Sequence, residues 1–383
     1  MVIRTQVLVV GGGPAGATAA RRLSESGIEV ILVEKDLNHR KPCGGGIAST
    51  ALEELEIPRN IPHRTVNTIR FVSPSGRKLD IPLEGGKILV VDRRAFDSLL
   101  RSLAGASGAQ VSEGEFAGFQ SRDNKDSKLR SRVLINGEPG IIESDYLIAS
   151  DGVNSRVRSS LGLKSSGYVF TLSCPVEGLE SDACEFWFGS EHAPSSYSWV
   201  FPRVDRDSHL PEALSPSAGW CSVGTGISYG NDARLFFERF LKRLNLNGSQ
   251  VKAARGYKVP SWKNGLYNVG NILFVGDSAT QVMPFTYEGI YYAMKSGEFA
   301  AEAIINKRLS LYRKLWRRRF LSRFMLMRTL ESVFLRSDSG AEKMFDMFSR
   351  AEVQEASMRL WLRKDAGRGS LFSYINLFRK FLH

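Results

Sequence analysis

The chain has 383 residues, of which 43% are hydrophobic and 24% charged, and this ordinary globular composition excludes a wholly disordered protein. Its length predicts two or three domains. The net charge of +12 is concentrated at one end, because residues 307–383 carry 18 Lys and Arg against 7 Asp and Glu and leave only +1 for the first 306 residues. This distribution argues against a nucleic-acid-binding surface over the whole protein.

The four cysteines are too scattered for a disulfide framework and form no C-x-x-C zinc pair. The N-terminus shows no signal-peptide pattern, and no apolar run reaches the length of about 18 residues that spans a bilayer. We therefore expect a cytoplasmic protein, either free in the cytoplasm or peripheral on the cytoplasmic face of a membrane.

A nucleotide-binding motif opens the chain. Residues 6–10 predict a buried parallel strand, and the sequence Gly-Gly-Gly-Pro-Ala-Gly follows at once, before a helix-like run. In this G-x-G-x-x-G context Gly11 makes the tight turn, Gly13 lets the backbone approach a pyrophosphate, and Gly16 lets helix and strand pack closely. Glu34, at the end of the next strand, is placed to accept hydrogen bonds from ribose hydroxyls. The motif predicts a dinucleotide but does not choose between NAD and FAD.

Two later strand-to-loop crossings favour a long cofactor. Residues 146–150 run into Asp151, and residues 271–275 run into Gly276 and Asp277 ahead of a long helix-like segment. Asp277, at the carboxyl end of a strand, is placed to bond a ribityl or ribose hydroxyl. Backbone N–H groups near Gly289 and Ile290 are placed to face the O2 edge of a flavin.

The order of these motifs resembles the FAD-dependent oxidoreductases of the aromatic-hydroxylase fold, and two segments resemble the geranylgeranyl reductase family in particular. Residues 41–47 (KPCGGGI) are similar to the P-C-G-G-G segment of that family, and residues 197–202 (YSWVFP) are similar to its Y-x-W-x-F-P motif. Residues 91–97 resemble the segment whose arginine, Arg93 here, contacts the cofactor. The chain departs from the family at Tyr287, where glycine is usual before the E-G-I element.

Motif and resemblance together predict cofactor contacts along the first 290 residues. The predicted positions are Gly11, Gly13, Ala15, Gly16, Glu34, Lys35, Cys43, Gly44, Gly46, Arg93, Ala117, Asp151, Asp277, Gly289 and Ile290. Cys43 is expected near the flavin with its chemical role open, the alternative being a small buried structural cysteine. Cys174, Cys184 and Cys221 are predicted to fill sheets. The five histidines are expected in polar loops, and no metal site is predicted.

The middle of the chain predicts a second, mostly antiparallel sheet. Its strands are expected within residues 183–189, 196–201 and 219–227, with an earlier hairpin from residues 68–72 and 78–82. Alternation places Tyr197, Trp199 and Phe201, next to Pro202, on one face. That face is either the aromatic wall of a pocket for an elongated apolar substrate or an ordinary sheet core, and the resemblance favours the pocket.

The basic tail, residues 309–383, has two alternative interpretations. Apolar residues recur at helical spacing from Leu309 to Leu330, and a second aromatic and basic run lies at residues 374–381. One interpretation is a peripheral element on an anionic membrane surface, and the other is a helical subdomain that packs on the core and closes the substrate tunnel. A nucleic-acid role is not favoured.

The predicted fold class is α/β, with a Rossmann-like FAD-binding domain built on a parallel sheet, an α+β substrate domain with an antiparallel sheet, and a helical C-terminal region. The predicted limits are 1–65, 84–160 and 268–306 for the FAD-binding domain, 66–83 and 161–267 for the substrate domain, and 307–383 for the basic helical region.

The resemblance implies an FAD-dependent reductase that saturates isolated C=C bonds of a polyprenyl chain on a diphosphate, lipid, quinone or pigment. Because the sequence holds no second G-x-G-x-x-G unit, the external reductant is either NAD(P)H or a ferredoxin-like partner protein. The alternatives are an aromatic or quinone monooxygenase, a flavin electron carrier to membrane quinone, and a lipid-binding module with a vestigial flavin site.

Overall fold

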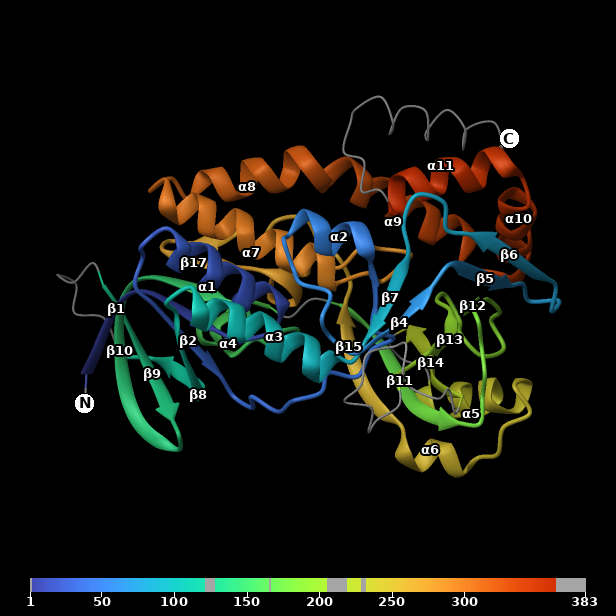
Figure 1. Cartoon of the computed structure of the whole chain (residues 1–383), viewed down its shortest axis with the longest axis horizontal. Helices are drawn as coiled ribbons and strands as arrows, with labels where there is room; N and C mark the ends of the chain where they lie inside the picture. The colour runs from blue at the N-terminus through green and yellow to red at the C-terminus, as the bar shows by residue number, and fades with distance from the viewer. Residues whose placement is uncertain (1, 121–127, 165–166, 205–218, 229–231, 363–383) are drawn as a thin grey trace.

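The computed structural model describes residues 2–120, 128–164, 167–204, 219–228 and 232–362, and shows two large sheets side by side beneath a layer of helices (Figure 1). The first sheet has a parallel centre, in which β1 pairs with both β2 and β10, β2 pairs with β8, and β10 pairs with β17. The antiparallel strand β9 joins β8 to β10, and β16 adds an antiparallel edge. The strands are β1 (Val2–Val10), β2 (Val30–Glu34), β8 (Gln110–Phe119), β9 (Leu129–Ile135), β10 (Glu138–Ala149), β16 (Asn268–Val269) and β17 (Ile272–Phe274).

Three helices cover one side of this sheet. Helix α1 (Pro14–Glu25) packs between α3 (Arg93–Ala106) and α7 (Ile290–Ile305). The contact between α1 and α7 requires a glycine, because a Cβ on Gly297 would lie 2.1 Å from the carbonyl oxygen of Ala15. The tight packing holds the start of α1 against the middle of α7, and the starts of both helices border the cavity described below. The short elements α2 (Ser49–Glu54), α4 (Arg156–Ser160) and the 3₁₀ turn η2 (Gly276–Ala279) complete this part.

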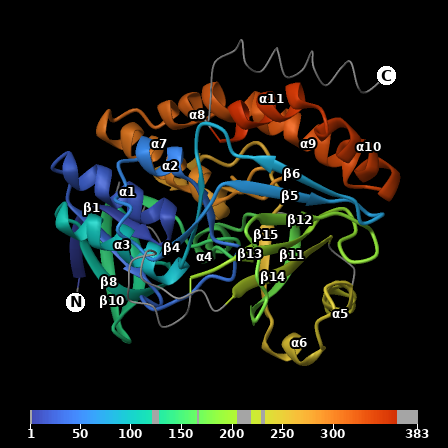
Figure 2. The same cartoon turned by 45° about the vertical axis from the view of Figure 1, so that its right-hand side comes forward.

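The second sheet has the strand order β15-β11-β14-β13-β12-β5-β6 and is antiparallel except for the parallel pair β12–β5. Its strands are β5 (Thr68–Val72), β6 (Lys78–Pro82), β11 (Tyr168–Glu177), β12 (Cys184–Trp187), β13 (Ser198–Pro202), β14 (Trp220–Ser228) and β15 (Arg255–Pro260). Helices α5 (Ala233–Arg243) and α6 (Ser249–Ala253) lie on the side of this sheet away from the long helical layer (Figure 2). The predicted hairpin therefore forms, and it joins strands that come more than a hundred residues later. The predicted domain limits themselves stay a prediction.

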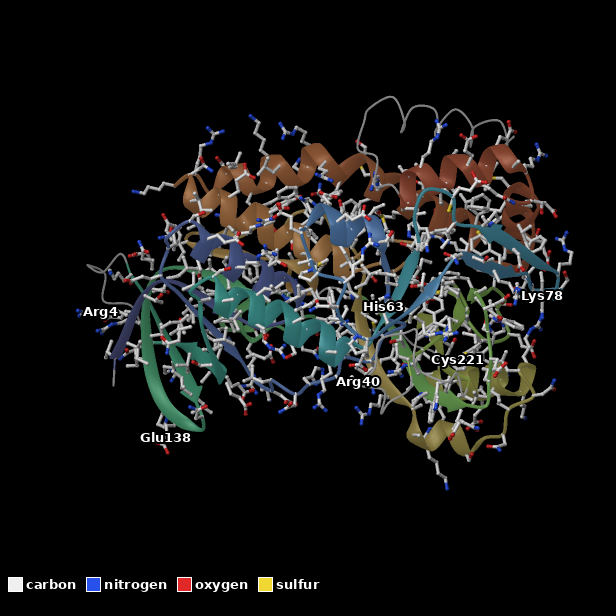
Figure 3. All side chains as sticks on the ribbon, in the orientation of Figure 1. Arg4, Arg40, His63, Lys78, Glu138 and Cys221 are labelled. Carbon is white, nitrogen blue, oxygen red and sulfur yellow. The ribbon has the colours of Figure 1, made fainter. Side chains whose placement is uncertain are left out.

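A small third sheet lies between the two large ones. It consists of β3 (Gly46–Ala48), β7 (Ile88–Val91) and β4 (His63–Val66), all antiparallel. Figure 3 places Arg40 and His63 at this junction, between Arg4 at the outer end of the first sheet and Cys221 in the second. The loop from β2 to β3, which carries the predicted Cys43 segment, thus runs directly between the two sheets.

The C-terminal region is a layer of helices along one side of the molecule (Figure 1). It comprises α8 (Ser310–Trp316), the π-helical turn η3 (Arg317–Leu321), α9 (Ser322–Phe334), α10 (Asp338–Phe348) and α11 (Ala351–Trp361). The apolar stripe predicted here is core, because Tyr312, Trp316, Phe320 and Phe324 are all buried. Its rings pack on Tyr292 of α7, with the Phe320 and Phe324 centroids 5.1 and 5.0 Å from that of Tyr292. The stripe therefore packs as the helical-subdomain interpretation expects, while residues 374–381 lie outside the described residues.

Within the described part of the chain, no helix combines the length and the apolar character needed to cross a bilayer.

Candidate functional site

One cavity of about 800 Å³ lies where the first sheet, the second sheet and the C-terminal helices meet. The loop after β1, the end of β2 and the loop before β3 form one end of it. Strands β5, β12, β13 and β15, the turn before α7, and helices α9, α10 and α11 form much of the rest. A cavity of this size is at the large end of ordinary small-molecule sites.

The glycine loop after β1 forms a cradle that opens into this cavity. Gly11 has φ +101°, and a Cβ there would lie 2.4 Å from the carbonyl oxygen of Ser150, so the close approach to β10 requires glycine. A Cβ on Gly16 would lie 2.0 Å from the Gly11 carbonyl oxygen, whereas a Cβ on Gly13 would meet no atom within 4 Å. The space beside Gly13 is therefore the place where a pyrophosphate can approach the backbone.

The start of α1 offers hydrogen-bond donors and a positive dipole end to this space. Pro14 is the first helical residue, and no side chain among the described residues caps the helix. Glu34 borders the cavity and accepts a hydrogen bond from the Gly12 backbone N–H at 2.5 Å. This combination of an open glycine, an uncapped helix start and a strand-end carboxylate fits the diphosphate and ribose of a dinucleotide.

Asp151 provides a second test of the fit. Its Oδ2 accepts a hydrogen bond from the Val157 N–H at 3.0 Å, while its Oδ1 is buried and has no hydrogen-bond partner among the described residues. Burial raises the pKa of this carboxyl group. Because Asp151 lines the cavity, a hydroxyl group of a bound cofactor can satisfy the remaining oxygen.

Asp277 reaches the cavity but already has partners within the chain. Its Oδ2 lies 2.6 Å from Nζ of Lys41 and accepts a hydrogen bond from the Tyr257 hydroxyl at 3.2 Å. Burial is the largest single influence on Lys41 and would lower its pKa, but the combined effects of the Asp277 and Tyr257 oxygens raise it. Lys41 is therefore a charged cation at the wall of the cavity. The sequence analysis included Lys41 in the segment 41–47 but predicted no role for it.

Cys43 and Arg93 are neighbours in the same wall. Nη1 of Arg93 lies 3.5 Å from Sγ of Cys43, and the Gly45 N–H donates to that sulfur at 3.1 Å. The buried guanidinium is held from the other side by Asp97, at 2.9 Å. The two predicted positions, fifty residues apart in the chain, are thus brought together, and both line the cavity.

The aromatic face of β13 lines the apolar half of the cavity. Tyr197, Trp199 and Phe201 all border it, and Phe186 of β12 lies between two of them, with ring centroids 5.2 Å from both Tyr197 and Phe201. A Cβ on Gly44 would lie 2.7 Å from the Phe201 ring, so the cysteine segment and the aromatic wall are in direct contact. The apolar lining continues onto the C-terminal helices through Met327, Leu330, Phe334, Phe348, Met358, Leu360 and Trp361.

Three of the predicted site residues do not line the cavity. Gly16 instead permits the packing of α1 against the glycine loop, and Pro202 lies at the buried end of β13. Ala117 is exposed, although Glu115 and Phe116 before it border the cavity. The strand pairing is irregular between Phe116 and Gly118, so simple alternation along β8 does not hold there. All the other predicted residues lie in the cavity wall, and their contacts with a cofactor remain predictions.

Sequence analysis missed the residues that come from turns and from the helical layer. Tyr287 lines the cavity, and its hydroxyl lies 2.8 Å from Oε1 of Glu331 on α9. The departure from the family at Tyr287 was the available signal, whereas nothing in the sequence indicates that Glu331 faces it. His192 lies in the loop before β13, as expected of the histidines, but its burial was not foreseen. It is 1% exposed, its Nδ1 lies 2.8 Å from the Ser198 hydroxyl, and its ring centroid lies 5.1 Å from that of Phe240 on α5.

Comparisons with known proteins agree with this geometry. The FAD binding domain family matches residues 4–200. The chain is 30% identical to the chloroplastic geranylgeranyl diphosphate reductase of Arabidopsis thaliana, over 98% of this chain and 84% of that protein. It is 32% identical to digeranylgeranylglycerophospholipid reductase 2 of Methanothermobacter thermautotrophicus, over 83% of this chain and 84% of that protein.

Solved structures show the same fold. A geranylgeranyl bacteriochlorophyll reductase-like protein from Thermoplasma acidophilum superposes with a TM-score of 0.78 at 25% identity, covering 98% of this chain and all of that one. A flavin-dependent brominase superposes with a TM-score of 0.73 at 16% identity, which shows the shared fold alone. The predicted cofactor and fold class are confirmed, and the chain belongs to the geranylgeranyl reductase family of FAD-dependent oxidoreductases.

Proposed function

We propose that this protein saturates isolated C=C bonds of a geranylgeranyl chain carried on a diphosphate, lipid, quinone or pigment. The observation that carries the proposal is the continuity of one cavity, which joins the glycine cradle at one end to an aromatic and aliphatic lining at the other. An elongated hydrocarbon binds in such a lining through buried apolar area, about 25 cal/mol per Å². The family relatives named for geranylgeranyl substrates support the same substrate class.

In this proposal the glycine loop, Glu34 and Asp151 hold the nucleotide part of FAD, and the walls around Cys43, Arg93 and Gly289 hold its flavin part. Bound and reduced FAD supplies a hydride to one alkene carbon. The chain aligns the alkene beside the rings of Tyr197, Trp199 and Phe201 and excludes water from it. The weakly polarised double bond is thereby held in one orientation for hydride transfer.

A single-turnover experiment tests this function. The purified FAD-loaded protein is photoreduced without oxygen and mixed with geranylgeranyl diphosphate, while the flavin absorbance and the mass of the lipid are followed. We expect the flavin to reoxidise and the lipid to gain a pair of hydrogens for each bond saturated. A flavin that stays reduced with the lipid but reoxidises with a quinone would instead support an electron carrier. Reoxidation that requires O₂ and hydroxylates an aromatic substrate would support a monooxygenase.

Electron supply is part of the same proposal. The sequence has one G-x-G-x-x-G unit, and FAD occupies it, so the electron donor has no dinucleotide unit of its own. The donor, either NAD(P)H or a ferredoxin-like protein, therefore binds transiently to reduce the flavin. Stopped-flow reduction with each donor in turn identifies the one that reduces the flavin quickly enough to support turnover.

We further propose that the outer face of the C-terminal helices contacts an anionic membrane surface. With the aromatic stripe buried, this face still exposes the cations Arg313, Lys314 and Arg318, and Met325 is 57% exposed on the following helix. Basic and apolar side chains on one helical face are typical of attachment at the headgroup level.

Vesicle co-sedimentation tests the attachment. A triple variant, R313E/K314E/R318E, is compared with the charge-matched variant K78E/K242E/K252E, whose exposed lysines lie on β6, α5 and α6. We expect the wild type and the second variant to sediment with phosphatidylglycerol vesicles, and the first variant to stay in solution. Equal sedimentation of the two variants would contradict the proposed surface. Truncation at residue 307 is unsuitable because it would remove the buried stripe.

A further inference from the structure

We propose that Tyr287 is the acid that protonates the alkene carbon opposite the hydride, and that Glu331 returns the proton to Tyr287. The assignment rests on the proposed prenyl reduction and names the source of the second hydrogen. It is built from a strained turn, a hydrogen bond between distant elements, and the contrasting partners of the other cavity tyrosines.

The turn before α7 holds Tyr287 in a costly conformation. Phe285 has φ +72° and Tyr287 has φ +50°, and both values lie in the left-handed region that favours glycine. The turn closes on itself, since the Tyr287 N–H donates to the Met283 carbonyl and the Met283 N–H donates to the Glu288 carbonyl, each at 3.0 Å. A bulky residue at a strained position in a cavity wall is the pattern that functional constraints produce. The strain places the Tyr287 ring in the cavity wall, 5.6 Å from the ring of Tyr197.

Glu331 is placed to return a proton to Tyr287 after each turnover, which an acid needs in order to act repeatedly. It comes from α9, lies 2.8 Å from the Tyr287 hydroxyl, and is half-buried rather than sealed, so that it can exchange protons with solvent. Burial raises the pKa of this carboxyl group, against the opposing effects of the Tyr287 hydroxyl, the Phe285 N–H, Arg328 and Arg336. A protonated Glu331 can donate to the phenol oxygen, which leaves the phenol O–H free to point into the cavity.

Three other tyrosines line the cavity, and their partners do not replace a proton. Tyr292 forms a hydrogen bond with the Arg323 guanidinium group. Tyr197 donates to the carbonyl oxygen of Thr286 at 2.6 Å, and a carbonyl has no proton to give back. Tyr257 donates to Asp277, whose Oδ2 already forms an ion pair with the Lys41 ammonium group. Tyr287 differs from these tyrosines because its hydroxyl lies against Glu331, a half-buried carboxyl group that forms no ion pair among the described residues.

The step is balanced as follows. The alkene accepts a hydride from the reduced cofactor at one carbon, and its π-electron pair forms the new C–H bond at the other carbon with the Tyr287 proton. The phenol O–H bond breaks, and the phenolate takes the proton of the Glu331 carboxyl group. Glu331 then recovers a proton from water, while the cofactor has lost two electrons and the lipid has gained two hydrogens.

Two variants of the full-length, FAD-loaded protein test the assignment, with Y267F as the matched control. Tyr267 is buried and donates to Asn264, and it does not border the cavity. We expect Y287F to slow reoxidation of the photoreduced flavin by geranylgeranyl diphosphate by about 100-fold or more, which is the range of general acid catalysis. Reoxidation by ferricyanide, which transfers no proton to carbon, should be unchanged in Y287F, and Y267F should match the wild type in both reactions.

The second variant, E331Q, separates the relay from a merely structural contact. We expect the wild-type rate to fall as the pH rises past the pKa of Glu331, and the E331Q rate to be slow and independent of pH over that range. A solvent isotope effect on the wild-type reaction in D₂O should accompany the pH dependence.

The failures are distinguishable. A wild-type rate of lipid-driven reoxidation in Y287F would overturn the acid, and a wild-type pH profile in E331Q would overturn the relay. If Y287F also loses the ferricyanide reaction, the E331Q profile decides. If ferricyanide reoxidises the reduced flavin of the wild-type protein but no prenyl substrate does, the proposed function is overturned, and this assignment falls with it.

Discussion

Gly11, Gly13 and Gly16 lie within a stretch of six residues, but a side chain at each position would meet different surroundings. Gly11 and Gly16 face backbone atoms that cannot move aside, whereas Gly13 faces open space. The backbone of Gly13, at φ −72°, is also accessible to any residue. The three positions can therefore separate folding from cofactor binding.

We expect G13A to fold with the stability of the wild type and to weaken FAD binding by about tenfold or more, equivalent to about 1.4 kcal/mol. The added methyl group would occupy the approach of the pyrophosphate. G16A should instead lower the free energy of unfolding by about 1–3 kcal/mol, because its Cβ would overlap the Gly11 carbonyl. Urea unfolding of the apo-proteins and flavin titration measure the two effects. The same loss of stability in both variants would contradict this assignment.

His192 makes the stability of the second sheet depend on pH. Burial lowers its pKa to about 4, with Arg243 adding to the effect and Asp338 opposing it. Because the folded state resists protonation while the unfolded chain accepts a proton near pH 6.5, the stabilisation is complete above that pH and is lost as the pH falls toward 4. The loss should approach about 3 kcal/mol.

Urea unfolding of the wild type and of H192Q between pH 7.5 and pH 4.5 isolates this contribution. Glutamine retains a polar group near the Ser198 hydroxyl but does not titrate in this range. We expect the difference in unfolding free energy between the two proteins to shrink as the pH falls. A constant difference would show that His192 does not titrate as described.

At the scale of elements, the continuous run α8–η3–α9 behaves as core. Phe320 of η3 is 1% exposed and contacts rings from α7, α8 and α9. We expect F320A to cost about 3–5 kcal/mol of unfolding free energy, the usual cost of removing a buried aromatic ring. M325A, on the exposed side of α9, should change stability little. Thermal and urea unfolding provide the measurement, and a small effect of F320A would mean that the helical layer is only loosely attached.

Sequence patterns predicted the elements with local signals and missed the parts that depend on distant packing. The glycine loop, the hairpin of β5 and β6, and the face shared by Tyr197, Trp199 and Phe201 follow from turn chemistry and strict alternation. The irregular pairing in β8, which leaves Ala117 exposed, has no comparable signal. The approach of α9 to the turn at Tyr287 depends on how a helical layer settles on two sheets, and no periodicity specifies that.

At the scale of the whole molecule, the cofactor is expected to hold the parts together. The cavity touches both large sheets and the helical layer, so a ligand that fills it binds the folded state and not the unfolded chain. We expect FAD at a hundred times its Kd to stabilise the protein by about 2.7 kcal/mol, which raises the melting temperature in proportion to the logarithm of the FAD concentration. Removal of FAD by dialysis against denaturing salt, followed by refilling, tests this. A melting temperature independent of added FAD would contradict it.

The order in which the chain builds the cavity has an evolutionary consequence. The nucleotide cradle comes from residues before α8, whereas the far apolar wall comes from α9 to α11, at the end of the described chain. Substitutions at Met327, Leu330, Phe334 or Met358 can therefore lengthen, shorten or bend the lipid end of the cavity without altering any glycine of the cradle. Selection for a new prenyl carrier can act on one short stretch of gene while the redox half of the protein is inherited intact.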